Sequence, residues 1–265
     1  MAVVAFAARH DQVETDVRIP LGMAQLSPDG LSEQWVLRFC GDRHWALIAE
    51  ALGQHEAVFQ APDGRPVYAA FCATSLRMPP SGPLLGKTVH VRSTLYGLTD
   101  TRTGSRHRLS VDGTVIAELM MISTFVSHDK SGCNNRIHRN SVLGQMSLPP
   151  AGTELMALDG QARDTVRHLR GLDQTHAPEI HVERPVPSLD FNAVGLLYFP
   201  TFSRIAETAA WATGQAAPVR QRAVVHLGNI NPGDTIRVFD HGAMQVLARQ
   251  DGSPIAVIRT NPAVA

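Results

Sequence analysis

The chain has 265 residues, with 24 basic and 24 acidic side chains, and 44% of its residues are hydrophobic. This length suggests about two domains with a sizeable core, and the balanced charge excludes a general attraction to nucleic acid or to an anionic membrane. No stretch approaches the ~18 apolar residues that a membrane-spanning helix needs. No basic residue precedes the short apolar run at the N-terminus, so we expect no signal peptide.

Three cysteines, Cys40, Cys72 and Cys133, are odd in number and widely spaced. That pattern favours a reducing compartment over a disulfide framework or a zinc cluster. The twelve histidines include no HExxH arrangement, the helical spacing that places two zinc ligands on one face. We therefore expect a cytoplasmic protein without a metal site, a membrane partner or a nucleic-acid partner.

The first half of the chain predicts one helix followed by an antiparallel meander. Apolar residues recur at helical spacing over residues 31–52. Ser32 is the expected N-cap, and Gly41 is expected to split the helix or to add a turn. Asp112-Gly113 is a strong hairpin signal between the last two strands. The four predicted strands cover residues 66–77, 87–98, 106–111 and 114–126.

The second half repeats this order. Residues 179–186 alternate like a strand, and a helix is expected over residues 196–212 with Pro200 near its first turn. Asp251-Gly252 predicts the last turn. The remaining predicted strands cover residues 220–227, 234–239, 244–249 and 253–260.

The two halves are similar in sequence as well as in pattern. LLGKTVHVRS parallels INPGDTIRVFDH, and LSVDGTVIAELMMIST parallels LARQDGSPIAVIRTN, in the same order along the chain. We therefore predict two copies of a helix plus an antiparallel sheet, over residues 1–135 and 179–265. The polar, turn-rich segment between them predicts a linker region over residues 136–178.

Several motifs that carry chemistry are absent or ambiguous. SGPLLGKT lacks the first glycine of a phosphate loop, and no GxSxG nucleophile elbow occurs. Asp42-Arg43-His44 is compatible with catalysis, but we prefer a helix-surface ion pair beside a half-buried histidine. Arg163, Arg167 and Arg170 recur at helical spacing, as on a solvated helix face, although acidic carrier proteins also bind such faces.

Longer segments resemble a known superfamily. DFNAVGLLYFPTFSRIAETA resembles the loop and central helix of hotdog-fold thioesterases. GLSEQW and CGDRHW resemble, more specifically, the double-hotdog family of polyketide biosynthesis that includes the leinamycin-pathway bifunctional acyltransferase/decarboxylase. This similarity covers about Val17 to Thr260. It implies an α+β double hotdog, with two central helices each wrapped by a curved antiparallel sheet and the two sheets joined edge to edge.

The resemblance also implies a reaction. A methylmalonyl group on coenzyme A would lose carbon dioxide, and the remaining acyl group would pass to an acyl carrier protein. No cofactor is expected beyond the coenzyme A thioester substrate, because the thioester itself delocalises the carbanion. Donors at the N-terminus of a central helix would stabilise the enolate oxygen. The expected partners are acyl-CoA and acyl carrier protein, and the chain is expected to be a monomer or a homodimer.

One position departs from the thioesterase pattern. In one thioesterase branch, an Asp three residues before the loop glycine acts as nucleophile or base, and here Asn192 holds that place ahead of Gly195. An amide cannot take a proton from water, but its N–H groups can donate to an enolate oxygen. Asp190 has two open interpretations, an acid–base group or a cap of the turn. We expect decarboxylation rather than hydrolysis.

The resemblance assigns further residues to the site. It places the active-site tyrosine at Tyr68, for which a purely structural packing role stays equally open. Cys72 follows on the same strand among apolar neighbours, which predicts an inert thiol. The residues implied to contact substrate are Ser32, Glu33, Trp35 and Gly195, and for Ser32 a capping role is the alternative.

Two other functions remain open from the sequence. The first is a hotdog thioesterase, which would release a free acid. The second is a non-catalytic hotdog that binds acyl chains or carrier proteins. Finding Tyr68 and Asn192 in one open cavity would favour an enzyme, whereas a filled groove would favour a binding protein.

Overall fold

Tight turns and alternating side chains produce the long strands of the first half. In the computed structural model, which describes residues 13–169, 177–215 and 217–262, Asp112 and Gly113 have φ of 50° and 80°. Positive φ at both central residues is the geometry of a type I′ turn, whose twist matches that of the strands it joins. The turn joins β7 (Arg102–Val111) to β8 (Thr114–Ser127).

Every helix and strand predicted from the sequence is present, with shifts at its ends, and the structure adds elements that were not predicted. In the first half the remaining elements are β1 (Glu14–Pro20), β2 (Leu26–Ser27), β3 (Gly30–Leu31), α1 (Glu33–Ala51), β4 (Phe59–Gln60), β5 (Pro66–Arg77) and β6 (Thr88–Thr99). Between the halves lie β9 (His138–Arg139) and α2 (Thr153–Leu169). In the second half the elements are β10 (Glu179–Glu183), α3 (Pro187–Asp190), α4 (Phe199–Ala212), β11 (Val219–His226), β12 (Ile236–Asp240), β13 (Gln245–Arg249) and β14 (Pro254–Pro262).

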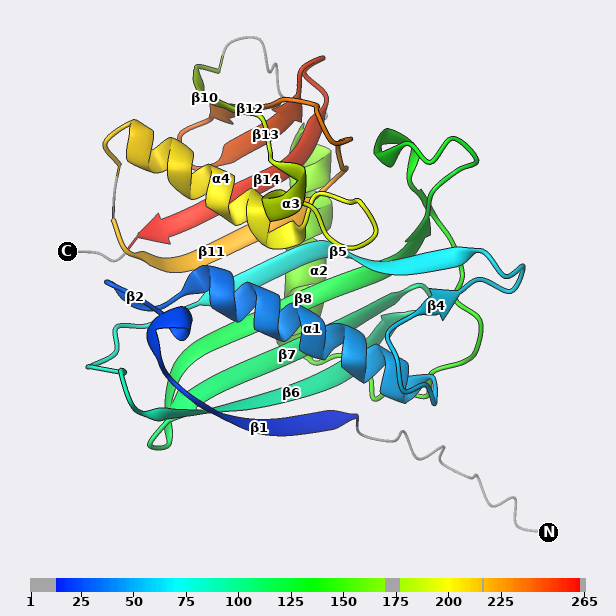
Figure 1. Cartoon of the computed structure of the whole chain (residues 1–265), viewed down its shortest axis with the longest axis horizontal. Coiled ribbons are helices and arrows are strands. Elements are labelled where there is room, and N and C mark those ends of the chain that lie inside the picture. The colour runs from blue at the N-terminus through cyan, green and yellow to red at the C-terminus, as the bar shows by residue number, and fades with distance from the viewer. Residues whose placement is uncertain (1–12, 170–176, 216, 263–265) are drawn as a thin grey trace.

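The long strands form one continuous antiparallel sheet (Figure 1). Its order is β1-β6-β7-β8-β5-β11-β14-β13-β12-β10, with β4 paired to β5 and β9 paired to β8. The two halves meet where β5 pairs with β11, so the predicted edge-to-edge joining of the two sheets is confirmed. Each half contributes one helix to the same face of this sheet, which is the α+β double-hotdog arrangement.

The two central helices touch at a glycine. Helix α1 is continuous through Gly41, so the expectation that this residue splits the helix is wrong. A Cβ atom at Gly41 would lie 2.8 Å from the Phe199 ring at the start of α4. The glycine therefore allows α1 and α4 to approach, and Gln34 Nε2 adds a hydrogen bond of 3.2 Å to the Pro200 carbonyl.

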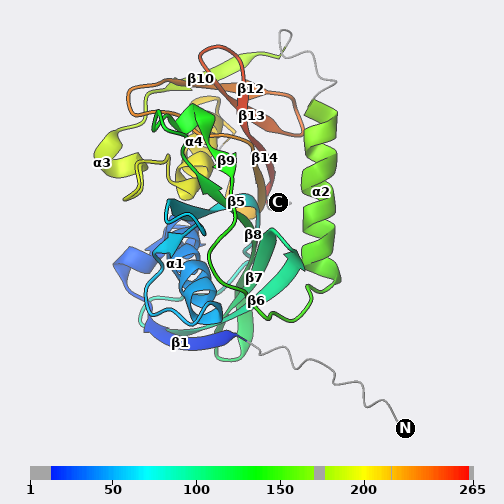
Figure 2. The same ribbon diagram turned by 90° about the vertical axis from the view of Figure 1, so that its right-hand side faces the viewer.

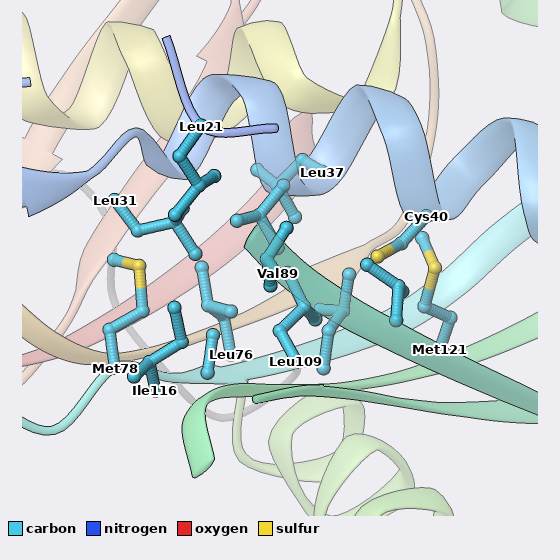
Figure 3. Close-up of a cluster of buried hydrophobic side chains, with 14 of the residues drawn as sticks. Leu21, Leu31, Leu37, Cys40, Leu76, Met78, Val89, Leu109, Ile116 and Met121 are labelled. Atoms are coloured by element: carbon cyan, nitrogen blue, oxygen red, sulfur yellow. The ribbon is translucent and has the colours of Figure 1, made fainter. Parts of the chain in front are cut away.

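The first central helix packs on the sheet through a core of apolar side chains (Figure 3). Leu37 and Cys40 of α1 face Leu109 and Met121 of the strands, and all four side chains are buried. Burying such residues stabilises the fold by roughly 1.5–3 kcal/mol each. A second cluster of buried hydrophobic side chains, which includes Phe202, packs α4 against the strands of the second unit.

The region between the two units contains a helix on the far side of the sheet (Figure 2). Helix α2 packs against β5 and β8 through Leu155 and Leu158, on the face opposite to α1 and α4. The predicted linker therefore also covers part of the outer surface. Residues 170–176 of the linker lie outside the described part of the chain.

The edge of the sheet and the character of the helices remain to be described. Strand β1, which the sequence analysis did not predict, pairs with β6 and forms one edge of the sheet. Within the described residues, no helix combines the length and the apolar character needed to cross a membrane.

Candidate active site

The seam between the two units contains a gap. Two strands pair with the same edge of β5. Strand β4 pairs there with Pro66 and Val67, and β11 pairs there with Ala73–Arg77. The backbone between them, Tyr68–Cys72, has no strand partner on that edge. A cavity of about 930 Å³ opens there, and all five of these residues line it.

Both units contribute to the walls of this cavity. The apolar side chains come mainly from the two central helices, β5 and the loop before α4; among them are Trp45, Phe59, Phe71, Leu197, Phe199 and Phe202. The polar and charged ones come mainly from α1, the segment 134–139 and the loop after β11; among them are Arg38, Asp42, Asn134, Asn135, Arg139, Asn192, Asn229 and Arg249. An apolar interior with a few polar groups is typical of small-molecule sites.

Tyr68 lies on the opposite face of β5 from its core-facing neighbours Val67 and Ala69. Its ring packs edge-on against His128 with 5.7 Å between the ring centroids. Its side chain is half-buried, and its hydroxyl makes no hydrogen bond with any described residue. The hydroxyl is therefore available to a molecule in the cavity.

Asn192 lies in the loop between α3 and α4. Its Oδ1 accepts hydrogen bonds from the backbone N–H groups of Val194 and Leu196, at 3.2 and 3.0 Å. These two donors fix which end of the amide is oxygen. The Nδ2 group has no partner among the described residues, so it keeps two N–H donors at the cavity wall.

Gly195 and Asp190 hold this loop in shape. Gly195 has φ of 77°, and its N–H donates to the Asn192 carbonyl at 2.9 Å. The buried Asp190 carboxylate accepts from the Val186 N–H and from Arg204, each at 2.8 Å. Neither residue lines the cavity. Asp190 therefore caps and anchors the loop, the second of its two sequence interpretations.

Two asparagines that the sequence analysis did not select clamp the loop to its surroundings. Asn134 Nδ2 donates to the carbonyls of Gly195 and Ile230, at 2.6 and 2.7 Å, and its Oδ1 accepts from His128 at 2.8 Å. Asn229 Oδ1 accepts from the Leu197 N–H at 2.8 Å. These contacts join segments far apart in the sequence, so no local motif reveals them.

Burial shifts the pKa of four side chains that line the cavity towards the neutral form. It raises the pKa of the Asp42 carboxyl, against the opposing charge of Arg43. It also raises the pKa of the Cys72 thiol, and that of Tyr198 to about 12. Burial lowers the pKa of His226 to about 3, and its Nε2 atom has no hydrogen-bond partner in the described structure. Cys72 is thus the inert thiol that its neighbours predict.

The residues at the start of α1 lie elsewhere. Ser32 caps the helix by accepting from the Trp35 N–H at 3.3 Å, and the Trp35 ring stacks on Phe39. Glu33 pairs with the buried Arg222 at 3.1 Å. Ser32 and Glu33 line a separate cavity of about 430 Å³, and Trp35 lines neither cavity. The structure therefore does not bring these three residues together with Tyr68 and Asn192.

The Asp42-Arg43-His44 segment divides between the cavity and the core. Asp42 lines the cavity, whereas His44 is fully buried and bonds Ser105 and Ser123, each at 2.7 Å. Arg43 lies over the Phe39 ring, and no ion pair joins it to Asp42. His44 is therefore a core residue, more deeply buried than expected.

Two arginines of the predicted basic face of α2 form ion pairs. Arg163 pairs with Asp159 at 2.9 Å and Arg167 with Asp164 at 2.8 Å, while Arg170 lies outside the described residues. Because Asp159 also pairs with Arg102, these carboxylates neutralise the described part of the face only partly. Among the residues the structure describes, no group of three or more His, Cys, Asp or Glu side chains is placed to hold a metal ion.

Comparisons with known proteins support the fold. No protein-family model and no curated protein matches the chain. Two solved structures similar to it are the 12:0-ACP thioesterase from Umbellularia californica (TM-score 0.63, 13% identity, 94% of this chain and 98% of that one) and an acyl-ACP thioesterase from Bacteroides thetaiotaomicron (0.65, 9%, 93% and 96%). A third is HtdX of Mycobacterium tuberculosis (0.57, 11%, 94% and 99%).

The topology of the sheet and these similarities together show that the chain has a double-hotdog fold. At identities of 9–13%, the likeness covers nearly the whole chain but extends to the fold alone.

Proposed function

We propose that this chain is an acyl-thioester enzyme that decarboxylates a malonyl or methylmalonyl thioester and transfers the resulting acyl group to an acyl carrier protein. One observation supports this most directly. Tyr68 from the first unit and Asn192 from the second line one open cavity, and both keep hydrogen-bond donors that no described residue uses. An open cavity also favours an enzyme over a hotdog with a filled groove.

Decarboxylation needs little more than a donor to the thioester oxygen. The bond between the α-carbon and the carboxylate breaks, carbon dioxide leaves, and the electron pair delocalises onto the thioester carbonyl. The oxygen then carries negative charge, which the Asn192 amide N–H groups stabilise. The enolate next takes a proton at its α-carbon. None of these steps requires a carboxylate base.

Transfer requires the acyl carbon to leave one sulfur and join another. In the direct route, the carrier thiol attacks the thioester and coenzyme A leaves as a thiol. In the covalent route, the Tyr68 oxygen first takes the acyl group as a phenol ester while coenzyme A leaves as a thiol with the phenol proton. The carrier thiol then takes the acyl group and returns its proton to Tyr68. An ordinary phenol is protonated at neutral pH, so we favour Tyr68 as a hydrogen-bond donor to the thioester or its carboxylate.

Thioester hydrolysis is the second candidate, because one carboxylate does line the cavity. The raised pKa of Asp42 makes that group a better base than an exposed aspartate. Two of the similar solved structures are described as acyl-ACP thioesterases. On this reading, Asp42 would activate water and the product would be a free acid.

Product analysis separates these functions. The protein is incubated with malonyl-CoA or methylmalonyl-CoA and an acyl carrier protein, and mass spectrometry identifies the products. We expect acetyl- or propionyl-carrier together with free coenzyme A. Release of a free acid without acylated carrier would support the thioesterase, and no turnover of any thioester would support a binding protein.

A further inference from the structure

Arg249 is a cation held in place by neutral groups. It is the last residue of β13, and it lines the cavity at the seam between the two units. Its Nε and Nη2 donate to the Asn229 carbonyl at 3.0 and 2.8 Å, and Nε also donates to Asn135 Oδ1 at 3.0 Å. Its Nη1 donates to Ser253 Oγ at 2.9 Å. These contacts fix the guanidinium through neutral groups, and no ion pair joins it to a carboxylate among the described residues.

The backbone beside Arg249 is shaped to admit it. A Cβ atom at Gly228 would lie 2.8 Å from Arg249 Nη2, so any larger residue there would displace the guanidinium. Arg249 uses its Nε–H and one N–H on each terminal nitrogen, which leaves two of its N–H groups free to bind a ligand.

The charge of this wall is positive. The cavity lining contains the guanidinium groups of Arg38, Arg139 and Arg249 but only one carboxylate, that of Asp42. Arg139 makes no ion pair with any described residue. Asp251, whose carboxylate senses the charge of Arg249, bonds Ser253 Oγ at 2.6 Å and not the guanidinium. Arg139 and Arg249 thus both line the cavity without an ion pair to any described carboxylate, so an anion in the cavity would meet positive charge.

We propose that Arg249, assisted by Arg139, binds the phosphate group of a pantetheine thioester. This inference rests on the proposed function, since it concerns how the same cavity holds its substrate. A phosphate occurs in the pantetheine arm of both coenzyme A and acyl carrier protein, and a fixed guanidinium binds it through paired, charge-assisted hydrogen bonds. The remaining apolar cavity would then hold the pantetheine and acyl portions.

A matched pair of ligands tests the site without chemistry. Isothermal titration calorimetry compares 4′-phosphopantetheine with pantetheine, which differ only in the phosphate. We expect wild type to bind the phosphorylated ligand at least about tenfold more tightly. Arg249→Gln should reduce this ratio to about one, and Arg249→Lys should restore part of it. The control variant is Arg136→Gln. Arg136 is exposed and lies three residues before Arg139, but it does not line the cavity, so this variant should leave the ratio unchanged.

Gly228→Ala and Arg139→Gln keep the proposal testable if Arg249→Gln fails to fold. Gly228→Ala keeps Arg249 but displaces its guanidinium, and Arg139→Gln removes the assisting charge. Both variants should lower the preference for the phosphorylated ligand. Equal binding of the two ligands, undetectable binding of 4′-phosphopantetheine at millimolar concentration, or an unchanged ratio in these variants would overturn the proposal.

The two proposals fail in different ways. If the wild type shows the phosphate preference but turns over no thioester, the anion site stands and the proposed enzyme does not. If it turns over thioesters without any phosphate preference, the enzyme stands and the anion site does not.

Discussion

Tyr68 and Asn192 line the same cavity from different units of the fold, and each keeps a donor that no described residue uses. The Asn192 oxygen is committed to two backbone N–H groups, so only its nitrogen can serve a ligand. The Tyr68 ring is steadied by His128, which in turn holds Asn134. At the scale of single residues, the proposed reaction therefore uses the Tyr68 hydroxyl and the Asn192 amide as hydrogen-bond donors and needs no ionised nucleophile.

Tyr68→Phe removes the hydroxyl and keeps the ring. We expect decarboxylation and transfer to fall together, because a hydrogen bond to the thioester serves both steps. Mass spectrometry of the acyl-carrier and of the released coenzyme A measures both rates. Loss of transfer alone would support a phenol-ester intermediate, and full retention of both would make the tyrosine structural.

Asn192→Asp replaces the amide donor with a carboxylate of similar size. The new charge would repel both the substrate carboxylate and the enolate, and losing one such donor costs about 3–4 kcal/mol in the transition state. We expect the rate of carbon dioxide release to fall at least about a hundredfold. An unchanged rate in the folded variant would remove Asn192 from the mechanism.

Part of this site can be read from the sequence, and part cannot. The likeness of FNAVG and PVYAAF to a family nominates Asn192 and Tyr68, and the structure places both in one cavity. Arg249 and Asn134 cannot be nominated in this way. Their partners Asn229 and Ile230 lie 20 and 96 residues away, so only folding brings these groups together.

At the scale of elements, the contact between α1 and α4 depends on Gly41. The Phe199 ring that occupies the space of its missing Cβ is itself confined, with the Phe71 ring centroid 4.4 Å away and the Tyr198 centroid 5.3 Å away. Phe199 also lines the seam cavity. A shift of this ring would therefore be felt at the site.

Gly41→Ala tests this contact against helix propensity. Alanine favours a helix by about 1 kcal/mol, but overpacking a confined site costs roughly 1–3 kcal/mol. We expect a net loss in the free energy of unfolding, measured by urea titration. Gly160→Ala is the matched control, because Gly160 of α2 has nothing within 4 Å of the added Cβ. Gly160→Ala should be as stable as the wild type or more stable. A change in the free energy of unfolding with the same sign in both variants would contradict this explanation.

Local patterns predict most elements, and their errors have physical reasons. Residues 66–77 match β5 fully because their alternation runs between turn formers. Gly41 indicated a break in the helix, but it relieves a tertiary contact that sequence periodicity does not contain. Strand β1 was missed because its only long-strand neighbour, β6, begins 68 residues after Pro20. The hairpin signals, by contrast, are complete within a few residues.

At the scale of the whole molecule, the first unit encloses a row of hydrogen-bonded polar side chains inside its apolar core. His44 and His107 are fully buried and share Ser105 Oγ, at 2.7 and 2.8 Å, while His107 also bonds Ser93 at 2.8 Å. Burial lowers the pKa of each ring from 6.5 to about 3. Both histidines are therefore neutral in the folded protein near neutral pH.

This burial makes stability depend on pH. The folded-state pKa is depressed, so each histidine's contribution is fully present above pH 6.5 and is lost as pH falls towards 3, because only the unfolded chain takes up the proton. Each should cost about 2 kcal/mol between pH 7 and pH 5. Urea titrations at both pH values should show that His107→Gln, although less stable at pH 7, loses less on acidification. An equal loss in variant and wild type would contradict this.

The duplicated fold places two halves of one site on a single chain. The gap between β4 and β11 along β5 opens the cavity, and the loop before α4 brings Asn192 to it from the other unit. In the proposed reaction, both decarboxylation and transfer take place at this seam, so one substrate need not move between two sites.

The most direct test is a single reaction in deuterium oxide. The protein is mixed with methylmalonyl-CoA and an acyl carrier protein, and the acylated carrier is analysed by mass spectrometry. Decarboxylation through an enolate predicts propionyl-carrier with a deuterium on the carbon next to the thioester, because the enolate takes its proton from solvent. Free methylmalonic acid, or a carrier that stays unacylated while coenzyme A is released, would contradict the account.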